Sequence, residues 1–376
     1  MARGDAPANA RVSAKLYDVT PTPKTAKRPV SRSDVTKDVM HRAARLEDRY
    51  HAWRERRVRR HGHTPTVVAY PGYGDGGWVR VMCRVLLTPN HRVGSRAERL
   101  AIKRRASVRG WRSFLAVPVN SAKVTIRIGD FTVDVTADRG GVVDEVIKVT
   151  LKPGKHTVHF SCEGSAEASA TVRVTPETAT LGIVCDVDDT VMVTALPRPF
   201  LAAWNSFVLD EHARVPTPGM AVFLSKLVNK QKRMPVIYLS TGAWNVAPTL
   251  TRFLSRNLYP EGALLLTDWG PTHDRMFRSG REHKQRSLRR LATEFPNIRW
   301  ILIGDDGQHD QHIYGDFQRE FPQNVAAVCI RRLSASEAVF AGRNKKNVEQ
   351  FVPPEGAPWV YGHSGGTLLK QLKKVL

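Results

Sequence analysis

The chain has 376 residues, of which 41% are hydrophobic, so it is long enough for two domains with a sizeable core. Its formal net charge of +23 predicts attraction to polyanions: an anionic membrane surface, phosphorylated substrates or, less favoured, nucleic acid. No apolar run approaches membrane-spanning length, which argues against a transmembrane segment. We therefore expect any membrane contact to be peripheral.

The four cysteines are far apart in the sequence and form no CxxC motif. Cys83, Cys185 and Cys329 lie in apolar, strand-like runs, which favours buried thiols over disulfides or metal ligands. Widely spaced, buried cysteines are typical of a reducing compartment and predict a cytoplasmic protein, which can also associate with a membrane.

Residues 1–64 are rich in Arg, Lys, Ala and Pro and are predicted to form a basic, partly helical arm. An apolar stripe at three- and four-residue steps indicates a helix from Ser33 to Arg60. Its basic end, Arg54–Arg60, allows two interpretations. The helix docks its stripe on the body of the protein, or it contacts a membrane interface or another polyanion.

Residues 65–176 are predicted to form a small β-sandwich-like domain. Short β-branched runs, several with alternating polarity, are separated by turn signals such as Gly129-Asp130 and Pro153-Gly154. The glycine-rich segment Gly72–Gly77 lacks the Lys-Ser/Thr of a phosphate-binding loop, and we expect an ordinary loop there. The predicted strands cover residues 67–70, 79–87, 123–128, 131–136, 143–151, 155–160 and 170–175.

From residue 177 to 345 continuous apolar strands alternate with helices, which predicts an α/β domain with a parallel, doubly wound sheet. Residues 346–376 are predicted to be a tail with a basic end. Strands are expected at 181–185, 235–239, 263–266, 300–303 and 325–330, and helices at 220–229, 249–257 and 282–294.

Three carboxylates, those of Asp186, Asp188 and Asp189, follow the first of these strands within four positions. Like charges at one strand end repel each other, so a cation is needed to hold them. Oxygen ligands of this kind favour Mg²⁺. A structural alternative is a polar turn in which Asp189 or Thr190 caps the next helix.

Further polar residues follow the other strands. Ser240 comes after the strand at 235–239, and Lys284 lies near the start of the helix at 282–294. In parallel sheets the carboxyl ends of the strands share one edge, where ligands bind. We therefore expect these side chains to meet the second acidic group, which follows residues 300–303 and consists of Asp305, Asp306 and Asp310.

This order of residues resembles the haloacid-dehalogenase-like phosphohydrolases, and more closely the actin-patch-type phosphatidate phosphatase family and its bacterial members. The resemblance covers roughly residues 177–335. It is carried by residues 186–190, 238–245, 264–270, 283–284 and 303–310, together with Tyr314.

The resemblance implies a role for each residue. Asp186 would be the nucleophile that forms an aspartyl-phosphate, and Asp188 the general acid and base. Mg²⁺ would be held by Asp186, the backbone carbonyl of Asp188 and Asp305, with either Asp306 or Asp310 completing the shell. Ser240 would bind the phosphoryl oxygens, and Lys284 would neutralise charge in the transition state.

Few residues separate Thr190 from Met234, which leaves no room for a large cap domain and predicts an open site. With the basic charge, this favours a phosphorylated lipid headgroup at an anionic membrane. Gly242-Ala243 stands where the family often has Ser-Pro, so another phosphomonoester stays open as the substrate. A second alternative is a non-catalytic protein that binds polyanions or membranes and carries an idle phosphatase fold.

Overall fold

The computed structural model describes residues 49, 52–89, 117–193, 215–231, 233–267, 273–307, 309–334 and 351–376, with the side chains of α7 described from residue 280 onward. Contacts divide the chain into two units, Met1–His51 and Ala52–Leu376, and all that follows concerns the second. Residues 52–60 are helical. The rest of the helix predicted from Ser33, except Arg49, and the basic stretch at 96–112 lie outside the described residues.

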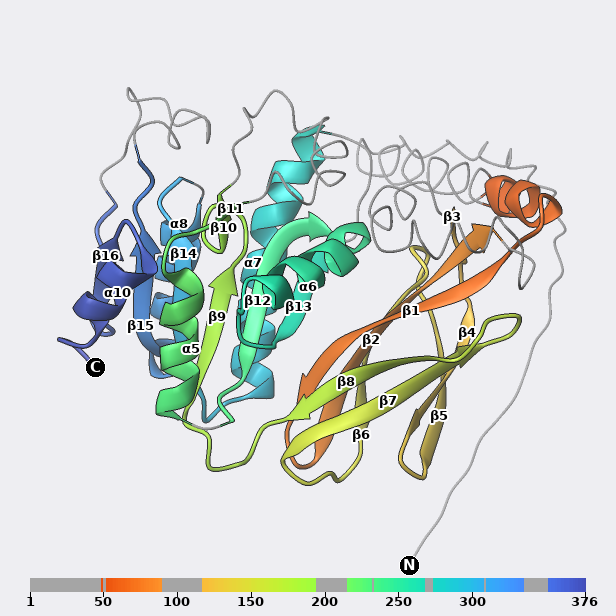
Figure 1. Ribbon diagram of the computed structural model, residues 1–376, viewed down its shortest axis with the longest axis horizontal. Helices are drawn as coiled ribbons and strands as arrows, with labels where there is room; N and C mark the ends of the chain where they lie inside the picture. Colours follow the sequence, from red (N-terminus) through yellow and green to blue (C-terminus); the bar gives the residue numbers. More distant parts are fainter. Residues whose placement is uncertain are drawn as a thin grey trace, which may run out of the picture. The chain divides into compact units, whose positions relative to one another are not determined.

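The first half of this unit is β-structure (Figure 1). Hydrogen bonds link its strands into one curled, eight-stranded sheet, in the order β3-β2-β1-β8-β7-β4-β5 with β6 paired to β2. The sandwich-like packing predicted for this region stays a prediction. We call this region the β-rich half. Its strands are β1 (His63–Gly74), β2 (Trp78–Pro89), β3 (Val117–Pro118), β4 (Lys123–Ile128), β5 (Phe131–Thr136), β6 (Val142–Lys148), β7 (Gly154–Cys162) and β8 (Ala168–Val174).

The first half of the predicted loop at Gly72–Gly77 is strand, because β1 continues to Gly74 and pairs with both β2 and β8. A Cβ at Gly72 would collide with the carbonyl oxygen of Arg80, and one at Gly74 with that of Trp78. Glycine is therefore needed here for the close approach of two backbones rather than for a flexible loop.

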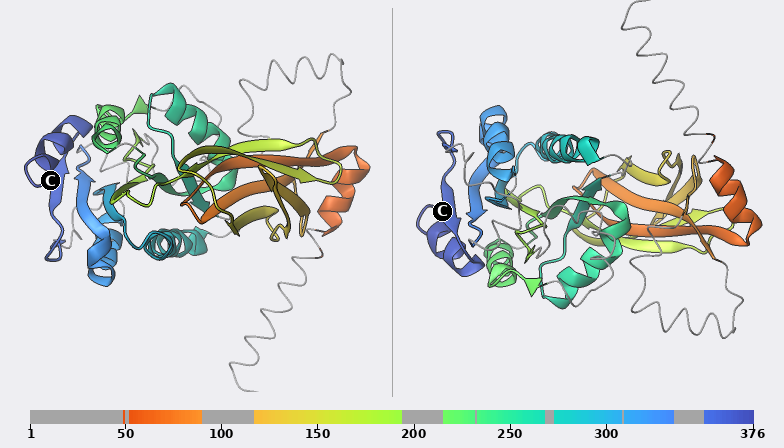
Figure 2. Two further views of the ribbon diagram at one scale, coloured as in Figure 1. Left: turned by 90° about the horizontal axis from the view of Figure 1, so that it is seen from below. Right: turned by 90° about the horizontal axis from the view of Figure 1, so that it is seen from above.

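The second half contains a six-stranded parallel sheet in the order β13-β12-β9-β14-β15-β16. Helices lie on both of its faces, with α7 and α8 on one side and α5, α6 and α10 on the other (Figure 2). The strands are β9 (Leu181–Asp186), β12 (Val236–Ala243), β13 (Ala263–Thr267), β14 (Arg299–Asp305), β15 (Val325–Arg331) and β16 (Trp359–Gly362). The helices are α5 (Met220–Lys230), α6 (Ala247–Arg256), α7 (His273–Glu294), α8 (Asp310–Glu320) and α10 (Gly365–Leu372), and β10 (Met192–Val193) pairs with β11 (Val215–Pro216) outside the main sheet.

The prediction of a tail beyond residue 345 is corrected by the structure. β16 extends the sheet by pairing with β15, and α10 packs against α5. The start of α10 is fixed by Ser364, whose hydroxyl accepts a hydrogen bond from the backbone of Thr367 while the Thr367 hydroxyl accepts one from the Ser364 amide. Residues 359–372 are thus part of the α/β half.

One hydrophobic cluster spans both halves of the unit. Tyr70, Tyr73, Met82 and Val142 of the β-rich half are buried together with the core of the α/β half. No helix among the described residues is long and apolar enough to cross a membrane.

Candidate active site

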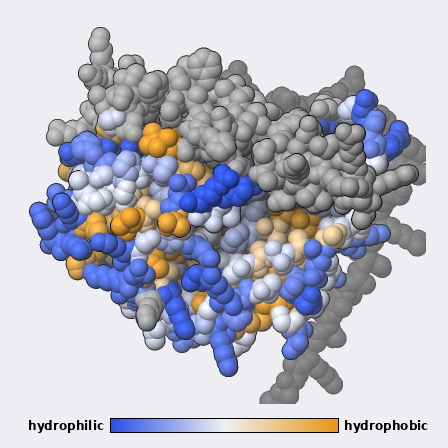
Figure 3. All heavy atoms as spheres, in the orientation of Figure 1, coloured by the Kyte–Doolittle hydropathy of each residue, from blue (hydrophilic) through white to orange (hydrophobic). Residues whose placement is uncertain are grey.

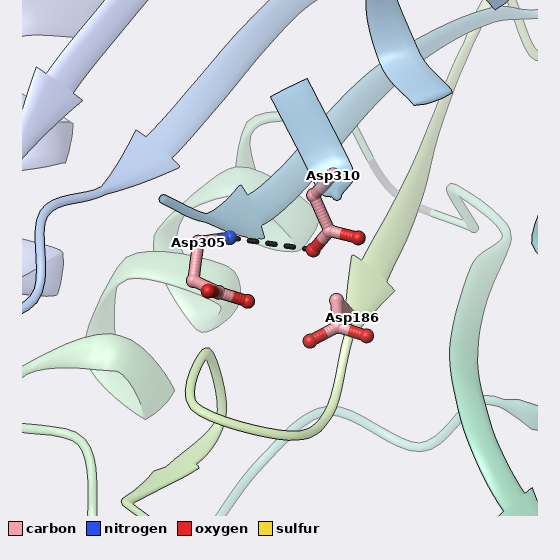
Figure 4. Close-up of side chains that lie close together, drawn as sticks. All are labelled: Asp186, Asp305 and Asp310. Atoms are coloured by element: carbon pink, nitrogen blue, oxygen red, sulfur yellow. Dashed lines mark hydrogen bonds between the residues drawn. The ribbon is translucent and has the colours of Figure 1, made fainter. Parts of the chain in front are cut away.

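Three carboxylates meet at the carboxyl edge of the parallel sheet (Figure 4). Asp186 ends β9, Asp305 ends the neighbouring strand β14, and Asp310 begins α8. Each side chain is at most 1% exposed, and one oxygen from each lies within 4.8 Å of the others. The pairing of β9 with β14 brings the first two together, and the backbone amide of Asp305 donates a hydrogen bond of 3.4 Å to Asp310 Oδ2.

Lys284 reaches this cluster from α7 and is buried. Its Nζ lies 2.6 Å from Asp186 Oδ1 and 2.6 Å from Asp310 Oδ1. Burial alone would lower the pKa of Lys284, but the two carboxylates outweigh it and raise the pKa above its ordinary value. Lys284 is therefore a permanent cation at this site.

Burial raises the pKa of Asp186 and of Asp305 well above the ordinary range, and the neighbouring carboxylates raise both further. Asp186 Oδ2 accepts no hydrogen bond from any described residue. Buried carboxylate oxygens without donors are costly unless a cation compensates them. The three oxygens and their charge thus fit a divalent metal ion with oxygen ligands.

Asp188 and Ser240 form a second contact beside the cluster. The Ser240 hydroxyl donates a hydrogen bond of 2.9 Å to Asp188 Oδ2, and the Gly242 amide donates one of 2.9 Å to Ser240 Oγ. Both side chains are buried. Every catalytic residue predicted from the sequence therefore lies at this edge of the sheet, although their roles stay predictions.

The two alternatives for the last acidic ligand occupy different places. Asp310 belongs to the carboxylate cluster, whereas Asp306 is only partly buried, and its Oδ1 accepts a hydrogen bond of 2.9 Å from the Leu333 amide. The geometry therefore favours Asp310 over Asp306 as a metal ligand.

Arg331, the last residue of β15, is a buried cation that the sequence analysis missed. Its Nη1 donates a hydrogen bond of 2.7 Å to the backbone carbonyl of Asp189, a residue held at a left-handed φ of 58°. Asp189 is 8% exposed, and its charge adds to the rise in the pKa of Asp305. An arginine ending an otherwise apolar strand was the available signal.

A pocket of about 520 Å³ lies elsewhere, at the opposite end of the sheet. It is lined by the first residues of β12 and β13, by the end of α6 and by residues of β1 and β8. Because the carboxylates lie at the far ends of these parallel strands, this pocket does not belong to the site.

The fold and the site define a class of protein: an α/β domain that buries an acidic cluster and a lysine at the carboxyl edge of a parallel sheet. Within this class, residues 181–332 match the family model for the catalytic domain of phosphatidate phosphatase APP1, and this domain belongs to that family. The match begins with the first residue of β9 and ends just beyond β15.

Similarity to individual proteins is more distant. Phosphatidate phosphatase APP1 of Saccharomyces cerevisiae is 25% identical over 158 residues, which cover 42% of this chain and 26% of that protein. The uncharacterized protein C29B5.04c of Schizosaccharomyces pombe is 23% identical over 235 residues, 58% of this chain and 37% of that protein. The chain thus spans about a quarter to two fifths of the length of these relatives.

Solved structures are only loosely similar. The carbohydrate acetylesterase XAC1771 from Xanthomonas citri aligns with 73% of this chain and 71% of its own, at 9% identity and a TM-score of 0.26. A similarity of this size defines neither fold nor function.

Proposed function

We propose that the chain is a Mg²⁺-dependent phosphomonoester hydrolase that works through an aspartyl-phosphate, with phosphatidate as its substrate. The observation that carries the proposal is the buried cluster of Asp186, Asp305 and Asp310 beside Lys284, in a domain of the phosphatidate phosphatase family. The alternation of strands and helices and the order of the residues at the strand ends fit a haloacid-dehalogenase-like arrangement.

In this proposal Asp186, Asp305, Asp310 and the backbone carbonyl of Asp188 hold the metal. A bound Mg²⁺ supplies positive charge that keeps these carboxylates ionised and reduces their repulsion of a phosphate group. The raised pKa of Asp186 supports a need for this charge, because a protonated carboxyl group is a poor nucleophile.

The proposed reaction uses these side chains in two steps. Asp186 attacks phosphorus, so that an Asp186–phosphorus bond forms while the ester bond breaks, and Asp188 protonates the departing alcohol oxygen. Water next attacks the aspartyl-phosphate and gives its proton to Asp188, which releases inorganic phosphate and restores Asp186. Ser240, which hydrogen-bonds Asp188 in the free protein, turns to the phosphoryl oxygens, and Lys284 neutralises their charge.

A lipid substrate is supported by the family and by charge. The net charge of +23 favours the anionic surface on which phosphatidate is presented. In the described part of the face shown in Figure 3, hydrophilic side chains are interspersed with apolar residues. The four free cysteines fit a cytoplasmic location for this contact.

The test is release of inorganic phosphate by the full chain, with and without Mg²⁺, from phosphatidate vesicles and from soluble phosphomonoesters side by side. Wild type is compared with Asp186→Asn and with Asp134→Asn, a matched change at an exposed acid of β5. We expect Mg²⁺-dependent release from phosphatidate by wild type and by Asp134→Asn alone.

Other outcomes would decide against parts of the proposal. Release from soluble esters but not from phosphatidate would overturn the lipid substrate and keep the reaction. No release from any ester, with unimpaired binding to anionic vesicles, would favour the alternative of a non-catalytic, membrane-binding protein. Equal loss in Asp306→Asn and Asp310→Asn would contradict the choice of Asp310 as the ligand.

A further inference from the structure

The segment that carries Ser240 continues directly into a contact with the β-rich half. Trp244 follows β12 and is 4% exposed. The Tyr70 ring of β1 stacks on the Trp244 ring at a centroid distance of 4.7 Å and an interplanar angle of 29°. The Tyr70 hydroxyl also donates a hydrogen bond of 3.4 Å to the Trp244 carbonyl oxygen. Trp244 is thus bound through both its ring and its backbone.

A second contact lies one residue further along. Arg84 of β2 donates a hydrogen bond from Nη1 to Asn245 Oδ1. Its Nε donates another, of 2.9 Å, to the carbonyl oxygen of Gly140, in the turn before β6. Arg84 is therefore fixed within the β-rich half at one end of its guanidinium group and holds Asn245 with the other.

The backbone between Ser240 and Trp244 needs such support. The pairing of β12 with β13 is irregular between Leu239 and Ala243, so a regular ladder does not hold this stretch. Thr267 supports it from one side, with its hydroxyl 3.0 Å from the Thr241 carbonyl oxygen and 3.2 Å from that of Gly242. The contacts of Tyr70 and Arg84 lie at its other end.

We propose that Tyr70 and Arg84 are positioning residues that hold the segment Ser240–Gly242 in the conformation that binds phosphate. In this proposal, which rests on the function proposed above, the β-rich half completes the active site without touching the substrate. The three carboxylates of the metal cluster lie on β9, β14 and α8, outside the segment that Tyr70 and Arg84 support, so we expect these two residues to affect phosphate binding rather than metal binding.

The variants that test this are Arg84→Met and Tyr70→Leu. We expect kcat/KM to fall about 10- to 100-fold, the range found when residues that support a site's ligands are changed. The inhibition constant of inorganic phosphate should rise as well, while the Mg²⁺ concentration for half-maximal activity stays unchanged. Tyr70→Phe keeps the stacked ring and should retain most of the activity.

Two further variants serve as controls that distinguish a local effect on the segment from a general loss of folding. Arg127→Met removes another arginine of the β-rich half, one paired with Glu167 on the surface, and should leave every parameter unchanged. Asn245→Ala breaks the Arg84 contact from the opposite side and should reproduce the Arg84→Met result. If Arg84→Met fails to fold, Asn245→Ala and Tyr70→Leu decide the question.

Amide hydrogen exchange of residues 240–245 tests the positioning role of Tyr70 and Arg84 independently of the proposed phosphatase function. Faster exchange in Arg84→Met and Tyr70→Leu than in Arg127→Met is the expected result, whether or not the wild type hydrolyses phosphatidate. Unchanged exchange, together with kcat/KM and phosphate inhibition within about twofold of wild type, would overturn the positioning role. A wild type inactive on every phosphomonoester would instead overturn the proposed function, and the exchange result would still stand.

Discussion

The protein contains two clusters of charged side chains that differ in their ratio of positive to negative groups. The first joins the β-rich half to the end of α7. Arg80 Nε lies 2.8 Å from Glu294 Oε1, and Arg80 and Arg290 contact the two carboxylate oxygens of Asp144 at 2.6 and 2.7 Å. Two arginines thus face two carboxylates, and the Tyr73 hydroxyl donates a further hydrogen bond of 2.7 Å to Glu294.

The second cluster is the candidate active site, where acids outnumber bases. Among the described residues the buried carboxylates are those of Asp186, Asp188, Asp189, Asp305 and Asp310, and the buried cations are Lys284 and Arg331. With all seven side chains ionised, five negative and two positive charges would give the cluster a net charge of −3. The pKa of Asp186 and of Asp305 is accordingly raised by burial, whereas the pKa of Asp144 in the first cluster is lowered by Arg290 and Arg80 against the effect of burial.

The first cluster stabilises the fold with charges that neutralise each other, whereas the second carries an excess of negative charge that a bound cation would neutralise. A balanced, hydrogen-bonded cluster satisfies its members within the protein, so it can join two surfaces. A buried excess of one sign destabilises the protein unless something of the other sign binds. The charged side chains of both clusters are at least partly buried, so burial alone does not distinguish them, but their net charges do.

The largest effect is expected from Asp186→Asn, which removes the proposed nucleophile. Phosphate release should fall by at least about 1,000-fold, since the amide cannot form the aspartyl-phosphate. Metal-free wild type must either bury the negative charge of Asp186 or bind a proton there, and both cost free energy. The metal-free variant carries a neutral amide instead and should therefore melt at a higher temperature than metal-free wild type. A thermal melt in EDTA checks this second effect, and a lower melting temperature would contradict the imbalance of charge.

Much of the site could be predicted because its chemistry follows the ends of strands. The apolar run at 181–185 predicts a buried strand, and parallel strands place Asp186 and Asp305 at one edge. Asp306 and Asp310 could not be separated in the same way. Their places depend on the turn between β14 and α8, where Asp306 bonds to Leu333 near the end of another strand.

Other features had no local pattern to reveal them. β16 is only four residues long and gains its place from pairing with β15, while α10 starts at two glycines. The balanced cluster joins Arg80 to Glu294, residues 214 positions apart. Such contacts depend on how the two halves pack, which neither composition nor periodicity records.

The next largest effect is expected from Lys284→Met, which makes the imbalance worse. Asp186 and Asp310 would lose their shared cation inside the protein, and such losses cost about 3–5 kcal/mol. Urea denaturation without metal measures the loss, and saturating Mg²⁺ should recover part of it. Lys155→Met, at an exposed lysine paired with Glu261, is the control and should change stability little. Equal stability of the two variants would contradict a buried ion pair.

Arg80→Met tests the balanced cluster and should have an intermediate effect. The change leaves Glu294 and Asp144 with one arginine fewer and should destabilise the fold by about 2 kcal/mol, since one partner of a hydrogen-bonded charged group is removed. Addition of Mg²⁺ should not recover this loss, because the cluster lies on the interface and not at the metal site. A recovery as large as that of Lys284→Met would remove the distinction between the clusters.

The smallest effect at neutral pH concerns His283, which precedes Lys284 on α7 and could add a positive charge beside the site. Burial lowers its pKa to about 4, so it is neutral at physiological pH and leaves the charge count unchanged. The unfolded chain binds a proton at this residue below about pH 6.5, and the folded protein does so only below about pH 4. The free energy of unfolding should therefore fall as pH decreases from about 6.5 to 4, by about 2.5 kcal/mol more in wild type than in His283→Gln. Urea denaturation of both proteins across this range measures the difference. Parallel curves would mean that folding leaves the pKa of His283 unchanged, so that the site would gain a third cation below about pH 6.5.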